Sequence, residues 1–230
     1  MTRMTMAPAI RIATLLTCLL LAGQAAVAQV KPHNYSRWET AIATYEKADQ
    51  TDRPAPGGIV FVGSSTILLW KTLAEDFAGY PVVNRGFGGS QIVDATHFAD
   101  RIVIPYQPRQ VFLRSGGNDI NAGKSPEQVF ADFRAFVARI HAALPKTEVV
   151  FIGLCPTIAR WKEAEANRQL NLLVSEFAQK SRGVRYIDTF EMSFDEKGRP
   201  RTDIFVRDML HFNPEGYRLL VERVRPALRR

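Results

Sequence analysis

The sequence has few cysteines, and this shortage limits how the protein can be stabilised. Only Cys18 and Cys155 occur in 230 residues. Since Cys18 lies in a predicted leader, we expect the mature chain to keep Cys155 alone and to form no internal disulfide. The fold must then depend on an apolar core, and the chain is long enough to bury one.

Long hydrophobic runs are also missing. The apolar segment at residues 12–22 is shorter than the ~20 residues that a membrane-spanning helix needs. It follows two arginines and precedes a small-residue cleavage site, as in a cleavable secretory signal. We therefore predict a signal peptide over residues 1–28 and a single exported domain over residues 29–230, periplasmic or extracellular, with no stable membrane insertion. An uncleaved anchor and a lipid anchor at Cys18 are the alternatives.

Nor does the sequence contain a nucleic-acid-binding pattern, an internal repeat or a low-complexity segment. The formal net charge is +7, but no stretch interleaves basic with aromatic residues as a nucleic-acid platform does. We predict no nucleic-acid partner. The positive balance is typical of a solvated basic surface, with attraction to acidic glycans or an anionic envelope as the alternative.

Apolar runs alternate with helical patterns along the rest of the chain. Candidate strands lie at residues 59–62, 81–84, 110–114, 148–154 and 184–187. Helical patterns or helix-start signals lie at residues 36–48, 67–73 and 162–180, and from Ser125 and Asn213 onward. Strands that alternate with helices predict one doubly wound α/β domain with a mainly parallel sheet.

The first candidate strand runs directly into Gly63, Ser64 and Ser65. In open α/β sheets, ligands bind just beyond the carboxyl ends of the strands. This position makes Ser65 the candidate nucleophile. By itself the tripeptide is more typical of an ordinary turn or of a helix N-cap, so the assignment needs support from other residues.

Two more strand ends carry polar or glycine-rich loops. Residues 86–90 contain three glycines, but the sixth-position glycine of a dinucleotide-binding loop is missing. The third strand leads to Asn118 and Asp119, and the role of Asp119 is left open. These loops are expected to meet Ser65 at the same edge of the sheet.

Near the C-terminus, Asp208 and His211 have the spacing of a catalytic pair. A serine hydroxyl needs a base to take its proton, and a neutral imidazole is the usual one. Asp208, three residues earlier, can hold the ring of His211 in the required tautomer. The backbone N–H groups of Ser65 and Gly89 and the amide of Asn118 can then stabilise an oxyanion. The alternative is a surface turn with no catalytic role.

Taken in order, Gly63-Ser64-Ser65-Thr66, the loop at Gly89, Gly117-Asn118-Asp119 and Asp208-x-x-His211 resemble the motifs of the SGNH (GDSL-like) esterases and lipases. The resemblance runs from about residue 59 to residue 217. It implies a flavodoxin-like three-layer α/β/α sandwich with a five-stranded sheet, and a serine hydrolase that needs no metal and no organic cofactor.

Carried over by position, the resemblance makes Ser65 the nucleophile and first oxyanion donor, with Gly89 and Asn118 as the other donors. His211 becomes the base and Asp208 its partner. Ser64 replaces the usual aspartate, as in a secreted bacterial subgroup with Gly-Ser-Ser. Ser64 itself is the alternative nucleophile.

Together, these patterns lead to the hypothesis of an esterase that removes short acyl groups, above all acetyl, from a carbohydrate or small ester through an acyl-enzyme. Arg160 and Trp161 follow the fourth strand and are candidates for binding a sugar, or else form a salt bridge and a packed indole. A lysophospholipase or thioesterase and a non-catalytic glycan-binding module are the rival functions. The oligomeric state is left open.

Two further side chains have two interpretations each. Trp70 is expected to pack beneath the helix after Ser65, or else to border a substrate cleft. Cys155 is expected to be a small buried side chain, or to lie at a strand end near the site.

Overall fold

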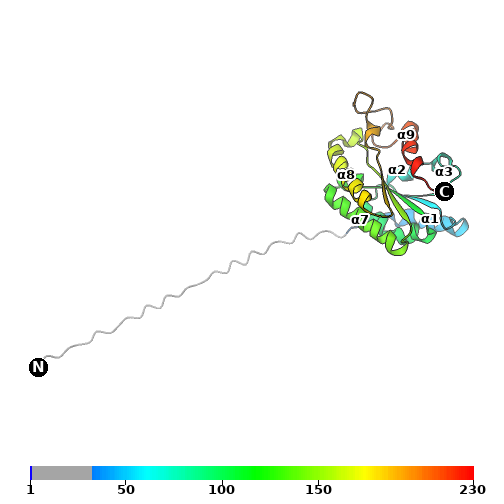
Figure 1. Ribbon diagram of the computed structural model, residues 1–230, viewed down its shortest axis with the longest axis horizontal. Helices are drawn as coiled ribbons and strands as arrows, with labels where there is room; N and C mark the ends of the chain where they lie inside the picture. Colours follow the sequence, from blue (N-terminus) through cyan, green and yellow to red (C-terminus); the bar gives the residue numbers. More distant parts are fainter. Residues whose placement is uncertain (2–32) are drawn as a thin grey trace. The chain divides into compact units, whose positions relative to one another are not determined.

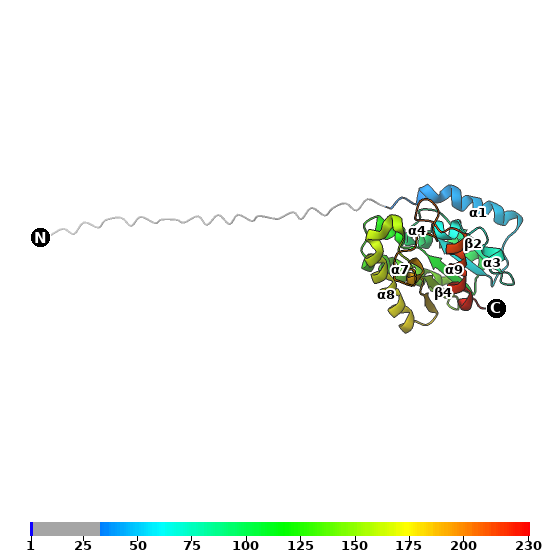
Figure 2. The same ribbon diagram turned by 90° about the horizontal axis from the view of Figure 1, so that it is seen from above.

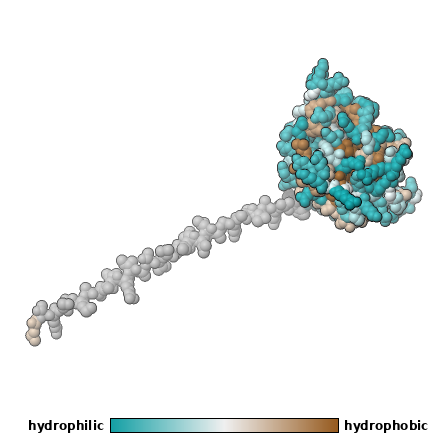
Figure 3. Space-filling model, in the orientation of Figure 1, coloured by the Kyte–Doolittle hydropathy of each residue, from teal (hydrophilic) through white to brown (hydrophobic). Residues whose placement is uncertain are grey.

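The computed structural model describes Met1 and residues 33–230, and Asn34–Arg230 form one compact unit. The predicted signal peptide after Met1, with Cys18, lies outside the described residues. In the part of the chain that is described, no helix is long and apolar enough to cross a membrane. The face of the unit drawn in Figure 3 is mainly hydrophilic, with apolar residues in small groups.

A five-stranded parallel sheet forms the centre of this unit (Figure 1). Its strands are β1 (Ile59–Gly63), β2 (Val82–Gly86), β3 (Gln110–Arg114), β4 (Glu148–Ile152) and β5 (Val184–Ile187). They lie in the order β2-β1-β3-β4-β5, and every pairing is parallel. The predicted α/β fold with a five-stranded sheet is confirmed. The second strand extends two residues further than predicted, and the fourth ends two residues earlier.

Helices cover both faces of the sheet and make three layers (Figures 1 and 2). They are η1 (Tyr35–Trp38), α1 (Glu39–Thr51), α2 (Ser65–Leu68), α3 (Leu73–Asp76), α4 (Ile92–His97), α5 (Ala99–Ile102), η2 (Ile104–Tyr106), α6 (Gly117–Asn121), α7 (Pro126–Ala143), η3 (Ile158–Glu163), α8 (Ala164–Lys180), η4 (Phe190–Ser193), α9 (Pro214–Val224) and η5 (Arg225–Ala227), where η marks a 3-10 helix.

Alternation along the strands divides the core between the two faces. Val60 and Val62 pack in the layer with α1, α4, α7 and α8, whereas Ile59 and Phe61 pack against α2, α3 and α9. All five residues of β1 are buried. Because both faces are covered, β1 is a continuous apolar run rather than an alternating one.

The helix predicted over residues 67–73 is instead two separate turns, α2 and α3. Trp70 lies between them with its ring almost fully buried, and its Nε1 donates to Asp76 Oδ2 at 2.7 Å. The break lets the indole N–H reach a carboxylate while the ring stays in the core. Of the two interpretations for Trp70, packing is confirmed.

Candidate active site

The turn after β1 places Ser65 at the carboxyl end of the sheet. Gly63 has φ +145°, and a Cβ added there would lie 2.1 Å from the carbonyl oxygen of Arg114. Only glycine therefore allows β1 to approach β3 this closely. The backbone N–H of Ser64 donates to the same carbonyl at 3.1 Å, and Ser65 is the first residue of α2.

Ser65, His211 and Asp208 form a continuous hydrogen-bonded chain. His211 Nε2 lies 3.0 Å from Ser65 Oγ, although the two residues are 146 positions apart. His211 Nδ1 lies 2.6 Å from Asp208 Oδ2. The spacing is that of a nucleophile, its base and the group that orients the base.

The second oxygen of Asp208 fixes the turn between the two side chains. Asp208 Oδ1 accepts the backbone N–H groups of Leu210 at 2.9 Å and of His211 at 3.0 Å. Met209, between them, has φ +56°. The backbone N–H and the ring of His211, with the N–H of Leu210, lower the pKa of Asp208 to about 2. The carboxylate therefore stays ionised across the neutral range.

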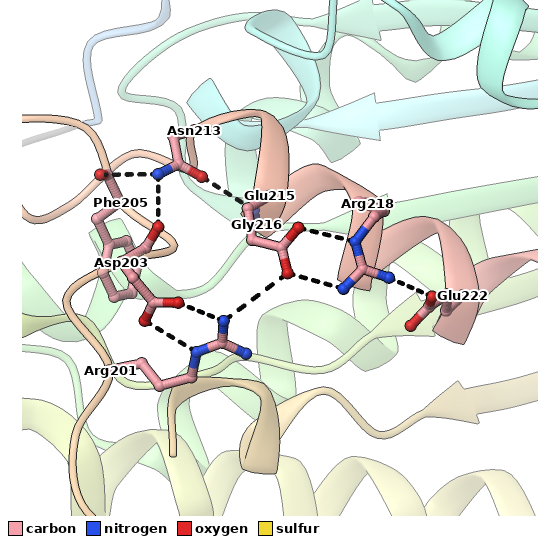
Figure 4. Close-up of polar contacts among 8 residues, drawn as sticks. All are labelled: Arg201, Asp203, Phe205, Asn213, Glu215, Gly216, Arg218 and Glu222. Atoms are coloured by element: carbon pink, nitrogen blue, oxygen red, sulfur yellow. Dashed lines mark hydrogen bonds and ion pairs between the residues drawn. The ribbon is translucent and has the colours of Figure 1, made fainter. Parts of the chain in front are cut away.

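The segment before α9 is tied to the start of that helix (Figure 4). Asn213 caps α9 by accepting the N–H of Gly216 at 3.1 Å, and its amide donates to the carbonyl oxygens of Asp203 at 2.7 Å and Phe205 at 3.2 Å. Arg201 forms an ion pair with Asp203 at 2.5 Å. The loop that carries Asp208 and His211 is thus held at both ends.

Replacing Asn213 tests this arrangement. In Asn213→Ala the cap and both carbonyl contacts are lost, so we expect unfolding free energy to fall by ~1–2 kcal/mol and activity to fall with it as the His211 loop loosens. Denaturant unfolding and ester turnover measure the two effects. Asn213→Asp keeps the acceptor for Gly216 but loses the donor. If Asn213→Asp matched wild type in both measurements, the contacts to Asp203 and Phe205 would not matter.

The opposite side of the site is built from the loops after β2 and β3. Asn118 Nδ2 donates to the carbonyl oxygen of Ser90 at 3.0 Å. Asp119 is fully buried and accepts the N–H of Ile92, at the start of α4, with both oxygens at 3.3 Å. These contacts join the Gly89 loop to the Asn118 loop. The sequence left the role of Asp119 undecided, and these contacts show that the role is structural.

Lys124 completes the surroundings of Asp119. Its Nζ lies 3.0 Å from Asp119 Oδ1 and 2.7 Å from Asp132 Oδ2. Burial raises the pKa of the Asp119 carboxyl, and Lys124 opposes that rise. The cation thus helps to keep a buried carboxylate charged where it accepts the N–H of Ile92.

Three potential oxyanion donors face one cavity of about 290 Å³, which Ser65, Gly89, Asn118 and His211 all line. The backbone N–H groups of Ser65 and Gly89 have no acceptor among the described residues. Asn118 Nδ2 uses one hydrogen on Ser90 and keeps a second. The arrangement can therefore offer three N–H donors beside a hydroxyl that is bonded to an imidazole.

The structure separates the two candidates for sugar binding. Arg160 lines the cavity, and its Nη1 donates to Asn118 Oδ1 at 3.1 Å and to the carbonyl oxygen of Gly117 at 3.3 Å. Trp161 is 38% exposed, packs edge-on against Phe194 and is not among the residues that line the cavity. Arg160 has non-helical φ and ψ angles inside η3, which turns the two neighbouring side chains apart.

Sequence analysis missed several residues that line the cavity. Arg114, at the end of β3, is buried, and its Nη2 lies 3.3 Å from Cys155 Sγ. Cys155 is buried and also lines the cavity, so both of its interpretations hold. The position of Arg114 at a strand end could have indicated from the sequence that it lies near the site. Nothing in the sequence indicated that Glu163 and Asn167, near the start of α8, would line the cavity.

Within residues 33–230 and Met1, no group of three or more His, Cys, Asp or Glu side chains has an arrangement that could hold a metal ion.

Comparison with known proteins places the chain in a family. The model of the GDSL-like lipase/acylhydrolase family matches residues 61–219. No curated protein sequence matches. A protein from Streptococcus pneumonia described as a platelet activating factor has a similar structure, with a TM-score of 0.73 and 21% identity over 85% of this chain and 94% of that one.

Two other solved structures share the fold. A GDSL-like lipase from Bacteroides thetaiotaomicron has a TM-score of 0.63 and 19% identity, over 84% of this chain and 96% of that one. A variant of an acetyl-xylooligosaccharide esterase from Geobacillus Stearmophilus has a TM-score of 0.58 and 16% identity, over 75% and 94%. With the match over residues 61–219, the chain belongs to the GDSL-like lipase/acylhydrolase family.

Proposed function

We propose that the protein is a serine esterase that hydrolyses short-chain carboxylic esters, above all O-acetyl groups on a carbohydrate or small ester. The observation that carries this proposal is the 3.0 Å contact between His211 Nε2 and Ser65 Oγ, with Asp208 on the other ring nitrogen. A serine hydroxyl bonded to an oriented imidazole is poised for attack on an ester carbonyl.

In this mechanism Ser65 Oγ attacks the carbonyl carbon and passes its proton to His211 Nε2. Asp208 stabilises the imidazolium, and the donors at Ser65, Gly89 and Asn118 stabilise the negative oxygen of the tetrahedral intermediate. Collapse breaks the bond to the alcohol, which leaves with the proton from His211. A water molecule then attacks the acyl-Ser65 ester and gives its proton to His211, which passes that proton to Ser65 Oγ as the bond to the acyl group breaks and the acid leaves.

Support for a short acyl group comes from the cavity. Its volume of about 290 Å³ is small, and polar side chains such as Ser115 and Thr157 form part of its lining. A long aliphatic chain buried against such groups would leave them without hydrogen bonds, which is costly. The acetyl-xylooligosaccharide esterase with a similar fold is consistent with an acetyl substrate.

An acyl-length series tests this function. We expect kcat/KM on 4-nitrophenyl esters to be highest for acetate and to fall steadily from butyrate to longer chains, because the cavity is small and polar side chains form part of its lining. A peak at octanoate or beyond would instead indicate a lysophospholipase or thioesterase.

Covalent labelling tests the rival that has no catalytic activity. A fluorophosphonate probe should label Ser65. Absence of both labelling and turnover would indicate a glycan-binding module.

Export belongs to the same proposal. Its support is the sequence pattern of residues 1–28, and the expected product is a protein that begins at Gln29 in the periplasm or the medium. Mass spectrometry of the protein recovered from each fraction tests it. A full-length mass in the membrane fraction would favour an uncleaved anchor.

A further inference from the structure

The unsatisfied polar atoms of the described residues gather at the catalytic cavity. In the described part of the chain, six buried side-chain atoms have no hydrogen-bond partner, and four of them belong to residues that line this cavity. The four are Arg114 Nε, Ser115 Oγ, Thr157 Oγ1 and Asn167 Oδ1. Each such atom costs ~1–3 kcal/mol unless something pairs with it. Their clustering points to partners that enter the cavity.

Glu163 adds a buried carboxylate to the same lining. The residue is 8% exposed, and Oε1 accepts the amide of Asn121 at 2.6 Å. Its second oxygen, Oε2, has no hydrogen-bond partner in the described part of the chain, and no cation there lies within ion-pair distance. Oε2 is not one of the buried atoms without a partner, so it is open to the cavity that Glu163 lines. A donor on a ligand in the cavity can therefore reach it.

Three polar side chains at the N-terminal part of α8 differ in whether their polar atoms bond to the rest of the fold. Glu163, Asn167 and Asn171 are four residues apart and therefore share one helix face. Asn171 Oδ1 accepts the N–H of Leu154 at 2.8 Å, and its Nδ2 donates to the Leu154 carbonyl at 2.7 Å. Asn167 is also buried, yet its Oδ1 has no partner among the described residues. The fold uses both polar atoms of Asn171, whereas Asn167 Oδ1 and Glu163 Oε2 remain available to a ligand.

The charged side chains of the cavity indicate which kind of ligand it can bind. Arg114 and Arg160 line the cavity together with Glu163 and have no carboxylate within ion-pair distance among the described residues. Two cations against one anion disfavour a positively charged group. A neutral hydroxyl both donates and accepts, so neighbouring hydroxyls can give a hydrogen to Glu163 and also bond to the amide of Asn167.

We propose that Glu163 and Asn167 bind hydroxyl groups of the alcohol half of the substrate, so that the enzyme selects acetyl esters of sugars or other polyols over esters of apolar alcohols. This inference rests on the proposed esterase function and specifies its leaving group. The acetyl group carries no hydroxyl, so the alcohol half is the part that can satisfy these side chains.

Matched substrates test the selection. The mono-O-acetyl positional isomers of glucose carry free hydroxyls on a six-membered ring, and cyclohexylmethyl acetate has a ring of similar size without them. We expect kcat/KM for the best glucose isomer to exceed that for cyclohexylmethyl acetate by ~100-fold or more, because the apolar ring leaves the buried polar groups unpaired. Equal or faster turnover of cyclohexylmethyl acetate would overturn the proposal.

Variants then assign the effect to these residues. We expect Asn167→Leu and Glu163→Gln each to lower kcat/KM for the glucose ester ~10- to 100-fold, mainly through KM, while turnover of cyclohexylmethyl acetate changes little. Gln169→Leu is the control, since Gln169 is exposed on α8. Thermal unfolding shows whether each variant is folded. Equal losses on both substrates would indicate a structural role, and no loss on either would show that the alcohol does not touch these residues.

The proposed function and this inference can fail separately. If Ser65→Ala abolishes turnover of 4-nitrophenyl acetate but no glucose isomer is preferred, the esterase stands and the polyol selection is wrong. If no ester is hydrolysed by the wild-type protein, both are wrong.

Discussion

Ser65→Ala should lower kcat on 4-nitrophenyl acetate by on the order of 10⁴- to 10⁶-fold, since removal of a triad nucleophile leaves only binding and the oxyanion donors to act. Ser65 Oγ is the atom bonded to His211 Nε2 at 3.0 Å, so no other hydroxyl takes its place without movement of the turn. Single-turnover kinetics and fluorophosphonate labelling measure the loss. Burial is not altered, so the melting temperature should change little.

Ser64→Ala is the matched control. Ser64 precedes α2, and its side chain makes no capping hydrogen bond. The Ser64→Ala protein should still be labelled by the fluorophosphonate probe, and peptide mapping should place the label on residue 65. Labelling of residue 64 in the wild type, or normal turnover by Ser65→Ala, would reject the mechanism.

Asp208→Asn should lower kcat by ~10³- to 10⁴-fold. Oδ1 of Asp208 accepts two backbone N–H groups, so the asparagine oxygen is expected to stay on that side. The new NH₂ group then faces His211 Nδ1 and acts as a donor. This forces the hydrogen of the imidazole onto Nε2, which can no longer accept the proton of Ser65.

The low pKa of the Asp208 carboxyl, about 2, bears on how the effect of Asp208→Asn is interpreted. Because the wild-type carboxylate is ionised across the neutral range, the deficit of Asp208→Asn reflects hydrogen-bond direction as well as lost charge. Glu196→Gln is the control, as Glu196 is an exposed acid in the segment before this loop. It should retain most of the activity. Steady-state kinetics that showed equal losses in the two variants would favour a general effect of loop charge.

Several parts of the fold and the candidate site follow from local sequence. The apolar run before Gly63 predicts a strand buried on both faces, and the structure has β1 there with every residue buried. Ser125 and Gln128 predict a capping box, and each side chain accepts the other's backbone N–H. These features depend on neighbours within a few residues, which the sequence displays directly.

Other parts depend on packing that the sequence does not display. Asn167 and Asn171 are equivalent by spacing, but only Asn171 meets the backbone of Leu154. Arg160 and Trp161 are adjacent, yet the turn within η3 sends one to the cavity and the other to Phe194. How a helix is rotated about its axis, and which atoms it then leaves without partners, is decided by contacts between distant segments.

The 146-residue separation between Ser65 and His211 has a consequence for biosynthesis. In the proposed mechanism the nucleophile, Ser65, is synthesised early, whereas its base lies in a loop that is anchored to α9. A polypeptide that lacks this loop would then have no means of activating Ser65. Under the proposed function, hydrolytic turnover can serve as an assay for chains in which this loop and α9 have folded.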